Sequence, residues 1–181
     1  MVLWGDVALV AQEPGAALDA YRLSAQVHFP DLLLLRLAEA LGKSGRGGDT
    51  VPLVSSYLRA YPGSVLAARM AASHRAYAGD WGQARALLEN LRRRGGGRDA
   101  RLLADLALAQ LRSGDAGAAV DTADAAYDLQ PASSVAAQAL GMALAAAGQD
   151  PDRARALLEK ARAVGGDNPM LVEARKQLGK G

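Results

Sequence analysis

The chain has 181 residues, half of them apolar, with no cysteine, two histidines and a formal net charge of +2. It is long enough for one domain with a continuous core, and the lack of cysteine excludes disulfide and thiolate chemistry. His28 and His74 are far apart in the sequence, which argues against a histidine metal cluster or a histidine-based triad. The small net charge gives no argument for a polyanionic partner.

The first thirty residues predict a short or degenerate helical hairpin. Val2 to Ala11 is apolar with little polar relief, Pro14 interrupts it, and a second helical pattern runs from Ala16 to Val27. The segment lacks the basic start of a signal peptide, and no later stretch reaches the roughly 20 apolar residues of a membrane-spanning helix. We expect a soluble chain whose compartment the sequence does not fix, and which is cytoplasmic or periplasmic if it is a fragment of a longer envelope protein. The hairpin is either a natural cap or the remnant of a longer array.

Residues 31–64 predict the first regular hairpin. Asp31 and Asp49 are predicted to cap its two helices, and Pro52 fits the first turn of the second because its missing amide costs little there. Leucines of the first helix fall on two faces, so this helix should be covered on two sides. The leucines expected to face the partner helix are Leu34, Leu37 and Leu41, and those on the other face are Leu32 and Leu35.

Residues 65–97 predict a second hairpin, with Trp81 just after its turn. We interpret Trp81 as a core residue that fills the gap between the two helices. The hairpin ends in an arginine- and glycine-rich run, Arg92 to Arg98. Such a run can bind phosphates, but no aromatic residue is interleaved with it, and cations and glycines also favour a helix C-terminus. We therefore interpret it as a helix end.

Residues 98–133 and 134–168 predict two further hairpins, and residues 169–181 a polar helix that closes the array. In the hairpin over 98–133, leucines of the first helix are expected to face alanines of the second, which allows a close approach. In the hairpin over 134–168, Asp150 is predicted to be the N-cap and Pro151 the first helical residue.

Glycines at the hairpin turns recur with a common period. They are separated by 34, 35 and 34 residues, and each lies between two apolar-periodic segments. Glycine is expected there because it alone enters the left-handed C-cap conformation without a steric cost. The four turn glycines are Gly45, Gly79, Gly114 and Gly148. Small or β-branched residues recur early in the second helices, at Thr50, Ala84, Ala119 and Ala154.

A period near 34 with small residues at the helix crossings resembles the tetratricopeptide repeat (TPR) family, and residues 31–168 resemble four consecutive repeats. The resemblance implies an all-α fold, a right-handed superhelical stack of antiparallel helix hairpins of the α-solenoid kind, with about ten helices. It also implies a non-enzymatic scaffold that binds a peptide or helix of a protein partner in a concave groove, which the first helix of each hairpin lines.

The resemblance implies a mainly apolar groove whose principal charges are two arginines. We expect its ligand to carry apolar anchors and at least one acidic residue. The carboxylate clamp of chaperone-binding members is not matched, since Leu35 and Glu39 stand where lysine and asparagine are wanted. The groove positions are Leu32, Leu35, Glu39, Leu66, Arg69, Ser73, Arg101, Ala104, Leu108, Val135, Gln138 and Met142.

No residue pattern indicates catalysis, a metal or a cofactor. The carboxylates are scattered and explained by caps and turns, and the glycines at 95–97 lack the Lys-Ser/Thr that follows in a P-loop. Two alternatives stay open beside the scaffold. One is a structural or self-association module of a larger bacterial envelope or polysaccharide-export repeat protein, suggested by composition. The other is weak nucleic-acid binding through residues 92–98, which the low net charge disfavours.

Overall fold

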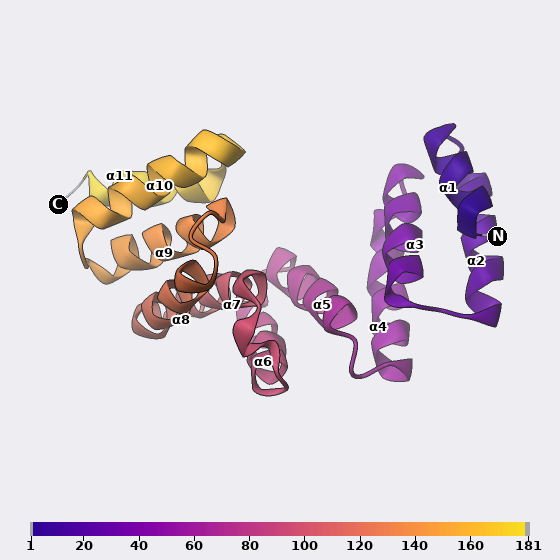
Figure 1. The fold of residues 1–181 in the computed structure, drawn as a ribbon, viewed down its shortest axis with the longest axis horizontal. Helices are drawn as coiled ribbons and strands as arrows, with labels where there is room; N and C mark the ends of the chain where they lie inside the picture. The colour runs from indigo at the N-terminus through magenta and orange to yellow at the C-terminus, as the bar shows by residue number, and fades with distance from the viewer. Residues whose placement is uncertain (1, 180–181) are drawn as a thin grey trace. The chain divides into compact units, whose positions relative to one another are not determined.

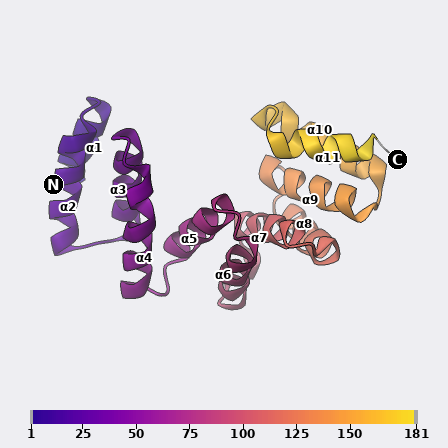
Figure 2. The ribbon, with the colours of Figure 1, turned by 180° about the vertical axis from the view of Figure 1, so that it is seen from behind.

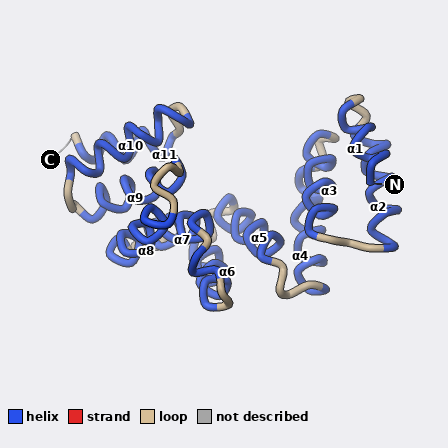
Figure 3. Tube along the Cα trace, in the orientation of Figure 1, coloured by secondary structure: helices blue, strands red, loops and turns tan. Residues whose placement is uncertain are grey.

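The computed structural model describes residues 2–179, and this part of the chain forms eleven α-helices joined by short turns (Figure 1). Along it, Figure 3 shows helices and loops without a strand, which confirms the all-α prediction. The helices are α1 (Val2–Val10), α2 (Pro14–Val27), α3 (Asp31–Lys43), α4 (Thr50–Ala60), α5 (Val65–Tyr77), α6 (Trp81–Arg93), α7 (Ala100–Arg112), α8 (Ala116–Leu129), α9 (Ser134–Ala147), α10 (Pro151–Gly165) and α11 (Pro169–Leu178).

The chain divides into two compact units, residues 1–71 and residues 72–181, and the division falls within α5. In the first unit, α1 lies beside α2 and α3 beside α4 in both Figure 1 and Figure 2. In the second unit, α9 lies beside α10, with α11 next to both. Each unit therefore has its own stack of hairpins.

In the first unit, α3 is buried on two sides, as its leucine run predicts, but the leucines divide differently. Leu33 and Leu37 belong to a buried cluster with α1 and α2. Leu34 belongs to a second buried cluster with residues of α4 and α5. The expectation that Leu34 and Leu37 share one face is therefore wrong. Neighbouring helices on both sides of α3 divide its apolar surface between them.

The prediction that Asp31 caps α3 is wrong. Asp31 is the first helical residue, and Pro30 precedes it without a side-chain cap. Its Oδ1 instead accepts hydrogen bonds from the Tyr57 hydroxyl (2.8 Å) and the Ser64 hydroxyl (2.7 Å). The Ser64 Oγ in turn accepts from the amide of Ala67, in the first turn of α5. One carboxylate thus links α3 to α4 and to the turn before α5.

The prediction that Asp49 caps α4 is also wrong. A short 3₁₀ turn over Gly47–Asp49 precedes α4, and the Asp49 side chain makes no cap hydrogen bond. It pairs with Arg46 instead, at 2.6 Å from the guanidinium Nη2. Because the Asp49 carboxylate binds the guanidinium of Arg46, three residues earlier, it does not cap the first turn of α4.

In the second unit, side-chain caps occur at the start of every α-helix from α6 onward. Each capping oxygen accepts a hydrogen bond from the amide three residues later, which satisfies one of the unpaired donors of the first turn. The predicted cap of Asp150 with Pro151 as first helical residue is confirmed. The capping residues are Asp80, Asp99, Asp115, Ser133, Asp150 and Asn168.

Small residues bring paired helices of the second unit close together. Ala119, Ala123 and Ala126 of α8 are fully buried, as expected for the helix that packs against α7. At Gly141 of α9, an added Cβ would lie 2.9 Å from the Leu158 Cγ of α10. A side chain at this position would therefore separate α9 from α10.

All four predicted turn glycines have positive φ, from 64° at Gly148 to 87° at Gly114. Each turn therefore uses a conformation that only glycine adopts freely, which confirms the prediction. Trp81 departs from expectation, because its ring is only partly buried and the Arg112 guanidinium carbon lies 5.3 Å from the ring centre. It is a cation–π partner at the start of α6, so its interpretation as a core residue is wrong.

Candidate functional site

In the first unit, the predicted groove positions lie on α3 and α5. Leu32 and Leu35 leave 59% and 45% of their surface exposed, large fractions for leucine. Leu66 and Arg69 of α5 are partly buried. The α3 positions thus offer apolar surface that no other residue of the described chain covers.

Glu39 lies at the centre of an ion-pair network. Its carboxylate pairs with Lys43 at 2.9 Å and with Arg36 at 3.2 Å. Hydrogen bonds from Lys43 and then Arg36 hold the pKa of Glu39 below its usual value. The Arg36 Nε also lies 3.1 Å from Asp6 Oδ1, which accepts a hydrogen bond from the Tyr21 hydroxyl at 2.7 Å.

Sequence reasoning missed Asp6, Arg36 and Lys43 as neighbours of the predicted site. The spacing of Glu39 to Arg36 and Lys43, three and four residues along one helix, was a readable signal. The contact of Arg36 with Asp6 joins α3 to α1 and had no local signal. Leu9 and Lys43 border two surface cavities of about 400 and 140 Å³ beside this network.

In the second unit, the predicted positions differ in exposure. Ala104 is fully buried and Met142 nearly so. These two residues belong to the core of the hairpins and present almost no surface to a ligand. They are buried because α7 and α9 pack directly against each other, and alanine-rich helices approach closely. Ser73 of α5 is exposed.

The accessible part of the second unit's positions is a mixed apolar and polar surface. Leu108 of α7 and Val135 of α9 are partly buried, and Arg101 is exposed. The Arg101 Nε donates to Asp105 at 3.2 Å, so part of its charge is already balanced. Gln138 accepts a hydrogen bond from the Asn168 Nδ2 at 3.2 Å and is thereby oriented by the residue that caps α11.

The arginine-rich run has the geometry of a helix end. Helix α6 stops at Arg93, and Gly95 adopts a left-handed conformation with φ of 114°. Arg92, Arg93 and Arg98 are exposed. Among the described residues, no group of three or more histidine, aspartate or glutamate side chains is arranged to hold a metal ion. Within residues 2–179, no helix is both long enough and apolar enough to cross a membrane.

No protein-family model matches the chain, and no curated protein matches it. Several solved structures, in contrast, match the fold of the chain. A MamA RS-1 double mutant is 20% identical with a TM-score of 0.69, covering 90% of this chain and 93% of that one. YrrB, described as a TPR protein with an unusual peptide-binding site, is 14% identical with a TM-score of 0.67, over 97% of this chain and 90% of that one. A tetratricopeptide repeat protein from Parabacteroides merdae is 14% identical with a TM-score of 0.72, over 96% and 69%.

The chain therefore belongs to the structural class of stacked helix hairpins, the α-solenoids. Within that class its fold is the tetratricopeptide repeat fold, as the turn period predicts. At these identities the likeness establishes the fold alone.

Proposed function

We propose that this chain is a non-enzymatic protein-interaction scaffold that binds a peptide or helix of a partner on the first helices of its hairpins. Two observations support the proposal. The fold is shared with YrrB, whose structure is described as having a peptide-binding site, and the first helices expose apolar side chains beside charged ones. Recognition of helices and extended peptides by such surfaces uses apolar anchors with a few polar contacts.

The single observation that carries the proposal is the mixed surface of α7 and α9. Leu108 and Val135 keep part of their apolar surface accessible, with Arg101 exposed on α7. A ligand with an apolar anchor and a carboxylate would complement both features, because guanidinium groups favour carboxylates. Asp105 forms an ion pair with Arg101 and already balances part of its charge. We therefore expect the apolar anchor of the ligand to contribute more affinity than the carboxylate of the ligand.

The first unit supports a second, independent surface of the same kind. Leu32 and Leu35 supply exposed apolar area on α3, and Glu39 brings a carboxylate whose charge Arg36 and Lys43 offset. Leu66 and Arg69 are the predicted positions of this unit on α5. We propose that each unit binds through its own first helices.

Substitution of Leu108 by glutamate tests this proposal. A charge at a partly buried apolar anchor should abolish capture of the partner in a pull-down from the source cell, since burying an unpaired carboxylate is costly. The matched control is Leu129→Glu, at an exposed leucine that ends α8, a second helix of its hairpin. Circular dichroism should show the same helical content in both variants.

The same pull-down separates the groove from the arginine-rich run. Arg93→Glu reverses an exposed charge at the end of α6 and should leave capture intact. The proposal is wrong if Leu108→Glu is silent while Arg93→Glu loses the partner, because the run over 92–98 would then be the binding site.

A further inference from the structure

The turn between α6 and α7 concentrates positive charge that the low net charge of the chain conceals. Residues 92–98 hold four arginines and no acidic residue, a formal charge of +4. The whole chain carries +2, so its remaining residues together carry −2. A strongly basic turn therefore lies on an otherwise slightly acidic chain, and its field favours anions at that turn.

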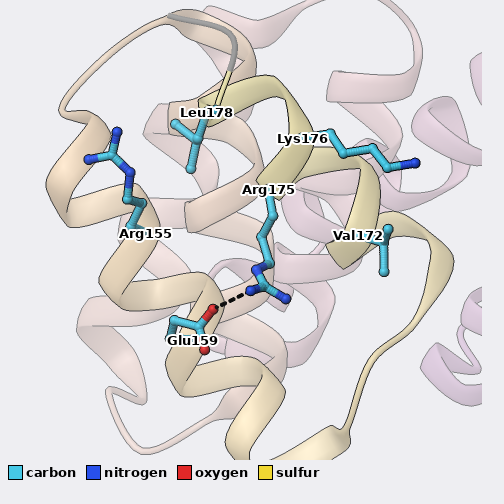
Figure 4. A pocket seen from close by; sticks show the side chains of 7 residues that line it. Arg155, Glu159, Val172, Arg175, Lys176 and Leu178 are labelled. Carbon is cyan, nitrogen blue, oxygen red and sulfur yellow. Dashed lines mark ion pairs between the residues drawn. The ribbon is translucent and has the colours of Figure 1, made fainter.

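The exposed arginines of α10 and α11, in contrast, are already paired with carboxylates. In the pocket that these two helices line, Arg175 reaches Glu159, with 3.1 Å between Nη2 and Oε1 (Figure 4). Arg155, which lines the same pocket, lies 2.6 Å from Asp152. Such pairs balance the charge of a guanidinium within the chain and leave little of it for a ligand.

Three arginines of the basic turn lack such partners. Arg92, Arg93 and Arg98 are exposed, and with the described residues they form no ion pair, side-chain hydrogen bond or cation–π contact. The acidic residues on either side of the run are engaged, because Glu89 is paired within α6 and Asp99 caps α7. The charge of these guanidinium groups is therefore available to a ligand.

A helix end explains only part of this run. Arg92 and Arg93 lie in the last turn of α6, where the helix dipole favours cations. Arg98 directly precedes Asp99, the cap of α7, and a cation is unfavourable at a helix N-terminus. A residue that breaks a local rule without a compensating contact is a candidate for function.

The 3₁₀ turn that joins the two helices is packed against both of them. An added Cβ on Gly96 would lie 2.9 Å from the Leu102 Cδ1 of α7. On Gly97, an added Cβ would lie 3.9 Å from the Arg92 carbonyl oxygen of α6. The turn thus returns the chain to the end of α6, so the backbone of Arg98 follows directly after a contact with Arg92. A site held in this way needs little ordering when a ligand binds.

A phosphate group fits these features better than a carboxylate does. It carries close to two negative charges and three strong acceptor oxygens, so it accepts hydrogen bonds from more than one guanidinium fork at once. Gly95 has open space where a side chain would stand, with nothing within 4 Å of an added Cβ. A ligand can therefore approach the backbone of the turn closely.

Two observations favour a phosphorylated protein segment over other carriers of phosphate. A long nucleic acid would extend past the turn, over a chain whose remaining residues carry −2, and residues 92–98 offer no aromatic ring on which bases stack. A membrane surface favours apolar side chains that insert, and residues 92–98 have none. A short phosphorylated segment needs only the turn itself.

We propose that the turn between α6 and α7 is a phosphate-binding site for a phosphorylated segment of a partner protein, held by the guanidinium groups of Arg92, Arg93 and Arg98. This site is separate from the proposed groove on α7 and α9. The proposal does not depend on that groove binding a peptide.

Fluorescence anisotropy with a labelled peptide tests the proposal. The probe is a short glycine- and serine-rich peptide with a pair of adjacent phosphoserines. The control peptides have the same sequence with plain serine, or with glutamate, at those positions. We expect saturable binding of the phosphorylated probe, about tenfold or more tighter than binding of the glutamate peptide, because phosphate carries more charge and more acceptors. Added salt should weaken it, since exposed charges are screened.

Removal of the unpaired guanidinium groups should weaken probe binding about tenfold or more, because charge-assisted hydrogen bonds to phosphate are lost. This turn variant combines Arg92→Gln, Arg93→Gln and Arg98→Gln. The matched control removes as much charge at exposed arginines of other helices and should alter affinity less than about twofold. It combines Arg22→Gln, Arg59→Gln and Arg75→Gln.

Single substitutions at Arg98 separate a binding role from a helix-end role. Arg98→Gln should weaken probe binding and leave the urea midpoint of unfolding unchanged or higher, because a cation before the cap of α7 does not stabilise that helix. Arg98→Lys keeps the charge but loses the planar fork, so its affinity for the probe should lie between those of the parent and Arg98→Gln. Leu108→Glu should bind the probe like the parent.

The proposal is overturned if the plain or glutamate peptide binds as tightly as the probe, or if the turn variant binds like the parent. Loss of probe binding in Leu108→Glu would place the probe in the groove instead. A lower urea midpoint with unchanged binding in Arg98→Gln would reduce the run to a helix end. Oligouridine RNA or anionic phospholipid vesicles are the last arm. If either binds more tightly than the probe and loses binding in the turn variant, the occupant is a nucleic acid or a membrane and not a phosphorylated protein segment.

Discussion

Gly5 of α1 lies against the ring of Tyr21, the fully buried tyrosine of α2. A Cβ built on Gly5 would lie 2.6 Å from the Tyr21 Cδ1 and 2.8 Å from its Cζ. These distances are far shorter than ordinary carbon contacts, so only glycine permits this packing of α1 on α2. The hydroxyl of the same tyrosine is fixed by its hydrogen bond to Asp6, which leaves the ring little room to move.

We therefore predict that Gly5→Ala destabilises the protein by about 1–3 kcal/mol, the usual cost of overpacking a core. The measurement is the free energy of unfolding from urea denaturation. Gly42→Ala is the matched control, because Gly42 lies in α3 with nothing within 4 Å of an added Cβ. It should be neutral or stabilising by up to about 1 kcal/mol. Equal stability of the two variants would contradict the close contact.

At the scale of elements, Tyr57 joins α4 to the start of α3. Its ring packs edge-on against Phe29, with 4.8 Å between centroids, and its hydroxyl lies 2.8 Å from Asp31 Oδ1 and 3.1 Å from the Phe29 carbonyl oxygen. Burial, and then the hydrogen bond to Asp31 and its charge, raise the pKa of Tyr57 to about 12.

This raised pKa makes stability depend on alkaline pH. The folded state holds the phenolic proton more tightly than the unfolded state, whose pKa is about 10. The stabilisation is complete below about pH 10 and is lost as the pH rises from there toward about 12. In Tyr57→Phe, the free energy of unfolding should be lower by about 1 kcal/mol at neutral pH. It should also fall less steeply than in the parent above about pH 10.

Urea denaturation across this alkaline range, with phenolate absorbance followed in parallel, measures both effects. Tyr77→Phe is the control, because Tyr77 is 98% exposed and its loss should change neither quantity. Should the alkaline slopes of Tyr57→Phe and the parent coincide, the hydroxyl of Tyr57 would not be linked to folding.

The helices and their turns were predictable because the signals for them are local. The positive φ at position 114 favours glycine whatever the rest of the chain does, and the cap at Asp150 needs an amide only three residues away. The role of Asp31 was not predictable in this way, since its partner Tyr57 is 26 residues later. A good cap residue at a helix start therefore does not establish a cap.

The candidate site was predictable only in part, for a related reason. Repeat position indicates which helix face a residue lies on, and two of the positions that it selected, Leu108 and Val135, are partly accessible. It cannot give the depth of burial, which depends on how closely the next hairpin packs, and so it included the buried Ala104. The contact of Arg36 with Asp6 joins α3 to α1 and had no local signal.

At the scale of the whole molecule, α1 carries an apolar face that no described residue covers. Trp4 and Val7 are 64% and 52% exposed, and Leu3 and Val10 more so. The one charged residue of this helix, Asp6, accepts a hydrogen bond from the Tyr21 hydroxyl and forms an ion pair with Arg36. Contiguous apolar surface of this kind on a protein commonly marks an interaction site.

We predict that the chain self-associates through this face, because a second copy can cover it with an equally apolar surface. Light scattering should then show a mass that rises with concentration, accompanied by a blue shift of tryptophan emission as Trp4 leaves water. Val7→Lys should raise the dissociation constant about tenfold or more, since an unpaired ammonium would be buried in the interface. Val164→Lys, at a valine of α10 that is 73% exposed, is the matched control and should self-associate like the parent. A point substitution is a cleaner test than deletion of residues 1–14, which would uncover Tyr21 together with the face. This face is not the interface if the parent protein stays monomeric at high concentration. The same conclusion follows if the parent associates and Val7→Lys associates as strongly.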